Sequence, residues 1–236
     1  MRYLITLLIL LTSTRLTGAD FVIDTLTIDS KILSESRTIL IFKPTGLINT
    51  DSIPIIYMLD GEFSRYRFEK IANGYSNQII GVGIINTDRR RDLLPINQAD
   101  KFNSFIETEL IPFVDSKYVS HKRVLFGHSF GGAFTIYSMI NKPGLFEKYI
   151  ASSPTPIMNL IDTEIYRQLN NKLTTDIKFY LSYGSKDMGQ VKKWATRLIE
   201  NLRSIEINRI NWTSDIFEGG NHNTSDMISI MNGLKF

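Results

Sequence analysis

Continuous apolar runs alternate along this chain with stretches that carry apolar residues at helical spacing, and this alternation is the feature that most constrains its fold. Runs such as 53–59, 78–85 and 123–127 are typical of strands covered on both faces of a sheet. The stretch 191–202, in contrast, places its apolar residues on one face of a helix. Strands that alternate with helices favour βαβ units, so the pattern predicts an α/β fold of three layers around a mostly parallel sheet.

The predicted elements follow one another without an internal repeat or a linker, so a chain of 236 residues is expected to form one main domain. The expected strands are 21–28, 37–44, 53–59, 78–85, 123–127, 148–153, 177–184 and 210–217. The first two are expected to pair antiparallel at one edge, and a polar turn is expected at 45–52, between the second and third strands. The expected helices are 67–73, 102–113, 130–140, 161–169, 191–202 and 227–234. Pro112 is expected to end or kink the second of these helices.

The first nineteen residues differ from the rest of the chain. Arg2 precedes the apolar run 3–11, which is too short to span a bilayer, and small residues follow at 17–19. We interpret residues 1–19 as a signal peptide and residues 20–236 as the mature domain, secreted or periplasmic and without membrane contact after cleavage. A buried first strand or an uncleaved anchor is the alternative interpretation.

Composition excludes several classes of site. The chain has no cysteine, so disulfides, thiolate metal sites and cysteine nucleophiles are excluded. Its three histidines do not share metal-ligand spacing, and the net charge of +3 is not gathered into a basic stripe. We therefore expect no metal, no cofactor and no nucleic-acid partner.

The stretch Gly127-His128-Ser129-Phe130-Gly131 fits the pattern G-x-S-x-G between a buried strand and a helix. In a nucleophile elbow the serine occupies a strained strand-to-helix turn, and glycines on either side let the backbone pack closely. A five-residue pattern often occurs by chance, but here the predicted strand before it and the predicted helix after it are the context that the motif requires. We predict that Ser129 is a nucleophile rather than a serine in a simple turn.

A serine hydroxyl needs a base within hydrogen-bond reach. His222 is the only histidine after Ser129, and hydrolases with this elbow order their residues as Ser, Asp or Glu, then His. His128 is expected to pack beneath the elbow, and His121 to lie at the wrong end of the sheet. Asp187, after the strand 177–184, is the favoured acid.

Other residues compete for or complete these roles. Asp215 and Glu218 are alternative acids, and Asp187 alternatively complements a helix N-terminus. An oxyanion hole requires two backbone N–H groups. We expect one from Phe130 and the second from the loop at Gly61 or Glu62.

With these positions in place, the chain resembles the serine esterase family of α/β-hydrolases. The resemblance rests on "IIYMLDGEF", "GVGIINTDRRRDLLP", "FIETELIPFVDSKY", "FGHSFGGAFTIYSMINKPGLFEKYIASSP", "YGSKD" and "EGGNHNTSDMISIMNGLKF". That family includes enterobactin-type siderophore esterases, S-formylglutathione hydrolases, feruloyl esterases and mycolyltransferases. The resemblance implies an α/β-hydrolase fold, Ser129 as nucleophile and His222 as base. The acid stays open, because some relatives are described with a Ser–His dyad and others place Glu near Asp187.

The resemblance also bears on substrate. It implies that Arg90 and Arg91 lie near a substrate cleft, although the charged run 89–92 is also typical of a solvated loop. Apart from the resemblance, the short stretch between 153 and 177 leaves little room for a large cap domain, which favours an open cleft and a bulky or polymeric acyl substrate. We expect a hydrolase of small-molecule carboxylic esters. An acyltransferase, a thioesterase and a catalytically silent binding protein are the alternatives.

Overall fold

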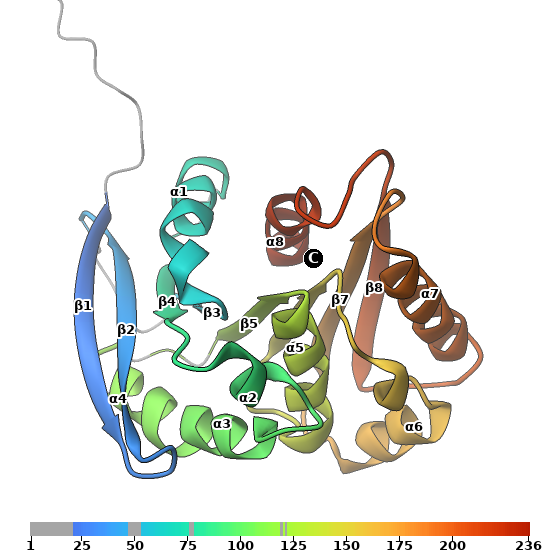
Figure 1. The fold of residues 1–236 in the computed structure, drawn as a ribbon, viewed down its shortest axis with the longest axis horizontal. Helices are drawn as coiled ribbons and strands as arrows, with labels where there is room; N and C mark the ends of the chain where they lie inside the picture. Colours follow the sequence, from blue (N-terminus) through green and yellow to red (C-terminus); the bar gives the residue numbers. More distant parts are fainter. Residues whose placement is uncertain (1–20, 47–52, 76–77, 119, 121) are drawn as a thin grey trace, which may run out of the picture.

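The computed structural model describes residues 21–46, 53–75, 78–118, 120 and 122–236, and their strands form one eight-stranded sheet (Figure 1). The strand order is β1-β2-β4-β3-β5-β6-β7-β8. The strands are β1 (Phe21–Ser30), β2 (Glu35–Pro44), β3 (Ile55–Met58), β4 (Ile80–Ile84), β5 (Arg123–His128), β6 (Lys148–Ser152), β7 (Ile177–Gly184) and β8 (Ile210–Phe217). Each of the predicted strands is present in this sheet.

Strand direction changes at one edge of the sheet. β1 pairs antiparallel with β2, and β2 pairs antiparallel with β4, whereas all pairs from β4 through β3 to β8 are parallel. The expected mostly parallel sheet with an antiparallel edge is confirmed. The carboxyl ends of the parallel strands therefore meet along one edge, where α/β proteins place their ligand sites.

Helices cover both faces of the sheet. The helices are α1 (Ser64–Gly74), α2 (Arg89–Leu93), α3 (Ala99–Phe105), α4 (Ile111–Asp115), α5 (Phe130–Asn141), α6 (Thr163–Lys172), α7 (Gly189–Arg203) and α8 (Ser225–Lys235). Short helical turns also occur at η1 (Gly61–Phe63), η2 (Ile106–Leu110) and η3 (Met158–Leu160). In Figure 1, α1 and α8 lie on one side of the sheet, and α2 to α6 lie on the other.

The two faces have separate hydrophobic cores because neighbouring residues of a strand point to opposite faces. In β3, Ile55 and Tyr57 pack with the larger cluster, which also holds the buried side chains of α3 to α7. Ile56 and Met58 pack with the smaller cluster, which holds the buried side chains of α1 and α8. The three-layer architecture is therefore confirmed, with unequal layers.

The helix expected over 102–113 differs from the prediction in its interior. It consists of α3, the π-helical segment η2 and α4, and the chain stays helical through Pro112. Proline cannot donate a backbone hydrogen bond, but it lies in the first turn of α4, next to the wider π-helical turn. Of the two expected outcomes, ending or kinking the helix, Pro112 does not end it, because α4 continues to Asp115.

The connection between β6 and β7 contains only η3 and α6, so no cap domain is inserted there. The predicted signal peptide, His121 and most of the turn at 45–52 lie outside the described residues. Within the described residues, no helix has both the length and the apolar character needed to cross a membrane.

Candidate active site

Ser129 lies in the sharp turn between β5 and α5. Its backbone has φ 59° and ψ −117°, a conformation that L-residues seldom adopt. The turn is tight enough that a Cβ atom at Gly127 would lie 2.1 Å from the carbonyl oxygen of Gly131. Position 127 therefore requires glycine, and the strained turn presents the Ser129 hydroxyl at the carboxyl end of β5.

His222 reaches Ser129 from the loop between β8 and α8. Its Nε2 lies 3.1 Å from Ser129 Oγ, although the two residues are 93 positions apart in the chain. The side chain of Asn221 holds the loop, since its Oδ1 accepts the N–H groups of Asn223 at 2.9 Å and Thr224 at 3.2 Å. The structure thus brings together the predicted nucleophile and the predicted base.

Asp187 lies in the turn between β7 and α7 and contacts His222 from the side opposite Ser129. Its Oδ1 lies 2.8 Å from His222 Nδ1, and its side chain has no exposed area. The same oxygen accepts the N–H of Met188 at 2.7 Å. Asp215, an alternative acid that lies in β8, instead accepts a hydrogen bond from the hydroxyl of Tyr180. Of the acids considered, Asp187 is the one that the structure places on the histidine.

His128 is closer to His222 than the sequence indicated. Its Nε2 donates a 2.7 Å hydrogen bond to the carbonyl oxygen of His222, and the two imidazole rings are 4.7 Å apart. Burial, with the nearby His222 as a further cause, lowers the pKa of His128 to about 4. His128 is therefore neutral near pH 7 and anchors the backbone of the loop that carries His222.

Ser153 is a residue of the site that sequence reasoning missed. It follows β6, it is fully buried, and its Oγ donates a 2.6 Å hydrogen bond to Asp187 Oδ2. No motif marks this serine, and the only available signal was its position at the carboxyl end of a buried strand.

The groups expected to form an oxyanion hole lie at two helix starts near Ser129. Phe130 is the first residue of α5 and Gly61 is the first of η1, so helix geometry leaves their N–H groups without intrahelical partners. The two segments are in contact, because a Cβ built on Gly131 would lie 3.3 Å from Leu59 Cβ and 3.4 Å from Asp60 Oδ2. The side chain of Glu62 is occupied by the N–H groups of Asn86.

The loop before η1 is held by a second set of polar contacts. Asp60 is buried in the left-handed conformation, with φ 53°. Arg89 binds both of its carboxylate oxygens, at 2.5 and 2.9 Å, and Asn86 binds Oδ1 at 2.8 Å. The hydrogen bond with Asp60 raises the pKa of Arg89. The guanidinium of Arg89 also lies 4.7 Å from the centre of the Phe130 ring.

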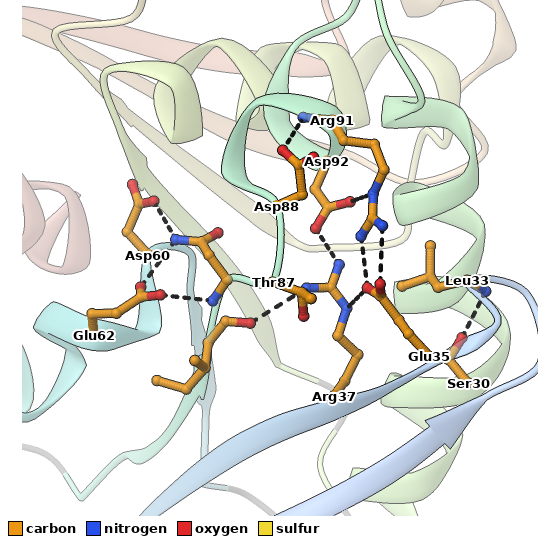
Figure 2. A network of polar contacts seen from close by, with 12 residues as sticks. Ser30, Leu33, Glu35, Arg37, Asp60, Glu62, Thr87, Asp88, Arg91 and Asp92 are labelled. Atoms are coloured by element: carbon orange, nitrogen blue, oxygen red, sulfur yellow. Dashed lines mark hydrogen bonds and ion pairs between the residues drawn. The ribbon is translucent and has the colours of Figure 1, made fainter.

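The two arginines predicted near the substrate have different surroundings. Arg91 points away from Asp60 toward the β1–β2 hairpin, where it binds Glu35 at 2.6 and 2.9 Å, and it also binds its neighbour Asp92 in α2 at 2.7 Å (Figure 2). The hydrogen bonds from Arg91 lower the pKa of the Glu35 carboxyl. Arg90 is exposed and lies 5.8 Å from the centre of the Phe130 ring. Arg90 thus lies beside the elbow, whereas Arg91 is occupied in a network that joins α2 to β2.

Exposed apolar side chains follow several of these loops directly. Phe63 ends η1, Met188 follows Asp187, and Met158 lies in η3 after the Ser153 segment, and each is about half exposed or more. Farther along, η3, α6 and α7 line an open cavity of about 890 Å³.

In the described residues no cluster of three or more His, Cys, Asp or Glu side chains is arranged to hold a metal.

Comparison with known proteins agrees with this geometry. Residues 30–192 match the family described as "Putative esterase". The ferri-bacillibactin esterase BesA of Bacillus subtilis is 29% identical over 58% of this chain and 51% of its own length. The siderophore enterobactin esterase of Emericella nidulans is 36% identical over 40% of this chain and 34% of its own.

The fold has close counterparts among solved structures. The BES protein of Bacillus cereus superposes with a TM-score of 0.79 at 24% identity, covering 91% of this chain and 95% of that one. The chain spans about half or less of the length of the three esterases among its curated relatives. The family match, however, covers more than half of this chain. The protein therefore belongs to the esterase family and has the α/β-hydrolase fold.

Proposed function

We propose that the protein is a serine hydrolase that cleaves carboxylic esters through an acyl-enzyme on Ser129. The observation that carries this proposal is the continuous chain of contacts from Ser129 Oγ to His222 and from His222 to Asp187. A histidine that binds the nucleophile with one nitrogen and a carboxylate with the other is the arrangement that activates serine.

In the proposed acylation, Ser129 Oγ attacks the ester carbonyl carbon and its proton passes to His222 Nε2. The Asp187 carboxylate holds Nδ1–H and stabilises the imidazolium that forms. The N–H of Phe130 and one N–H from Gly61 or Glu62 hold the oxyanion. His222 then gives its proton to the leaving alcohol as the carbon–oxygen bond breaks.

Deacylation repeats these steps with water. His222 takes a proton from the water, the hydroxide oxygen bonds to the acyl carbon, and the proton returns to Ser129 Oγ as the acid leaves. Both halves of the proposed cycle use only the residues of the chain, the ester and water.

We propose siderophore-type or other bulky esters as the substrate class. The names of two relatives identify them as siderophore esterases, one for ferri-bacillibactin and one for enterobactin. The lack of a cap between β6 and β7, together with the exposed apolar side chains beside the site, supports an open cleft for a large acyl group. Arg90 is proposed as a contact for that substrate.

We further propose that the protein is secreted or periplasmic, with residues 1–19 as a signal peptide and 20–236 as the mature esterase domain. Support comes from the composition of the first nineteen residues.

The test is hydrolysis of short p-nitrophenyl esters by residues 20–236, beside the variants Ser129→Ala and His222→Ala. We expect each variant to lose at least about a thousandfold in kcat, because members of a triad act as a unit. Circular dichroism checks that both variants fold. Turnover of a trilactone siderophore then tests the substrate class, and added alcohol separates hydrolysis from acyl transfer. A folded wild-type chain that binds esters without turning them over would instead indicate a binding protein.

A further inference from the structure

Ser153 occupies a backbone position that a serine seldom adopts. It is the first residue after β6, it has no exposed area, and its φ is 46°. A non-glycine residue in the left-handed region is held there by its surroundings at a cost in free energy. The N–H of Ser153 donates to the carbonyl of Ser182 at 2.7 Å, so the backbone is fixed against β7.

This backbone places the hydroxyl of Ser153 on the free side of the Asp187 carboxylate. Oδ1 of Asp187 already accepts hydrogen bonds from His222 and from the N–H of Met188. Oδ2 accepts the Ser153 hydroxyl at 2.6 Å. Because the Asp187 side chain is fully buried, water cannot replace this donor without a change of structure. The hydroxyl therefore fixes the rotation of the carboxylate plane.

The residues on either side of Ser153 hold the nucleophile. The N–H of Ser129 donates to the carbonyl of Ser152 at 2.9 Å, and the N–H of Thr155 donates to the carbonyl of Ser129 at 3.2 Å. A single short segment thus contacts the backbone of the nucleophile and the side chain of the acid. Any shift of this segment would change both ends of the Ser129–His222–Asp187 chain together.

We propose that Ser153 is a positioning residue that orients Asp187 toward His222 and keeps the acid in register with the nucleophile. The inference rests on the proposed function for its effect on turnover. It adds a fourth side chain, from β6, to the residues supplied by β5, β7 and the loop after β8.

Ser229, a second buried serine in the same region, provides a control for a purely structural role of Ser153. Ser229 is also fully buried, and its hydroxyl contacts Ser152 at 2.8 Å and Ser182 at 2.6 Å. It does not contact Asp187 or His222 in the described structure. Ser229→Ala removes a buried hydroxyl of the same size close to the same strand ends, so it is the matched control for Ser153→Ala.

The experiment measures kcat and KM of both variants on p-nitrophenyl esters. Alanine keeps the Cβ of serine, so Ser153→Ala leaves the backbone cost unchanged and removes only the hydrogen bond. We expect kcat to fall about tenfold with KM within about twofold, since a hydrogen bond to a charged group has roughly this effect. Ser229→Ala is expected to keep the wild-type kcat.

A second comparison separates action through Asp187 from general loosening. In an Asp187→Ala background, Ser153→Ala should change kcat by less than about twofold, because its target is absent. An equal fall in both backgrounds, an unchanged kcat in Ser153→Ala, or an equal loss in Ser229→Ala would overturn the proposal.

A readout that needs no turnover keeps the inference apart from the proposed function. The proton on His222 Nδ1, observed by NMR, reports the hydrogen bond to Asp187. The charged and titratable groups around it are Asp187 and His128, with Arg67 and Asp226 acting on His128 from α1 and α8. This resonance should persist in Ser229→Ala and broaden or disappear in Ser153→Ala. Its persistence in Ser153→Ala refutes the inference even if the wild type proves inactive on esters, and Ser153→Cys serves if the alanine variant does not fold.

Discussion

Replacing His128 by glutamine should make the folded protein more resistant to acid. His128 donates to the His222 carbonyl through Nε2, and the Nε2 of glutamine can supply the same donor without titrating. The comparison between His128 and glutamine therefore isolates the effect of protonation at this one site, because His222 is present in both proteins.

The magnitude follows from the pKa of His128. Burial lowers it from 6.5 to about 4, so between these pH values the unfolded chain binds a proton that the folded chain does not. Stability then rises with pH through this window and is lost as pH falls from 6.5 toward 4. At about 1.4 kcal/mol per pKa unit, the wild type should lose about 3 kcal/mol more than His128→Gln between pH 7 and pH 4.

The assay is urea unfolding at pH 7, 6, 5 and 4, followed by the fluorescence of Trp194 and Trp212. Free energies come from linear extrapolation, and equal m-values in the two proteins show that the unfolded states are comparable. If both proteins lose the same free energy over this range, His128 is not buried as a neutral group and the reasoning fails.

Three further substitutions test other parts of the structure. Asp187→Asn should keep the fold and lower kcat by about ten-thousandfold, measured on p-nitrophenyl esters, because the amide no longer holds the imidazole in the required tautomer; a loss below tenfold would indicate a Ser–His dyad. Gly127→Ala should abolish activity and lower the melting temperature, since its Cβ would overlap the Gly131 carbonyl at 2.1 Å, and wild-type activity would contradict the tight turn. Asp92→Ala leaves the fully buried Arg37 without its closest partner and should lower the free energy of unfolding in urea by about 3–5 kcal/mol; a loss below 1 kcal/mol would show that the ion pair is not needed.

The features that depend on local sequence patterns could be predicted from the sequence. The strands are read from continuous apolar runs, and the order of Ser129, Asp187 and His222 along the chain follows from the elbow motif and its context. Both depend on local sequence and on the rule that parallel strands end at one edge of the sheet. The contacts that the structure shows among these three residues are the ones that this reasoning requires.

The remaining features depend on packing between distant segments. The contact of Ser153 with Asp187 requires a left-handed backbone conformation at Ser153, and a serine in a sequence gives no indication of that conformation. Arg91 could not be assigned to Glu35 without knowing that the β1–β2 hairpin turns toward α2. Pro112 was expected to end or kink a helix, because local propensity does not report the π-helical turn beside it.

The small size of the second hydrophobic core affects the order in which parts of the protein unfold. α8 rests on this core, and the loop just before it carries His222, whereas Ser129 lies between β5 and α5 in the body of the sheet. The cluster under α1 and α8 buries fewer side chains than the one under α3 to α7. Amide hydrogens of α8 should therefore exchange with deuterium through partial openings that leave the central strands protected. In rising urea the histidine would leave the serine before the sheet melts, so that inactivation precedes global unfolding.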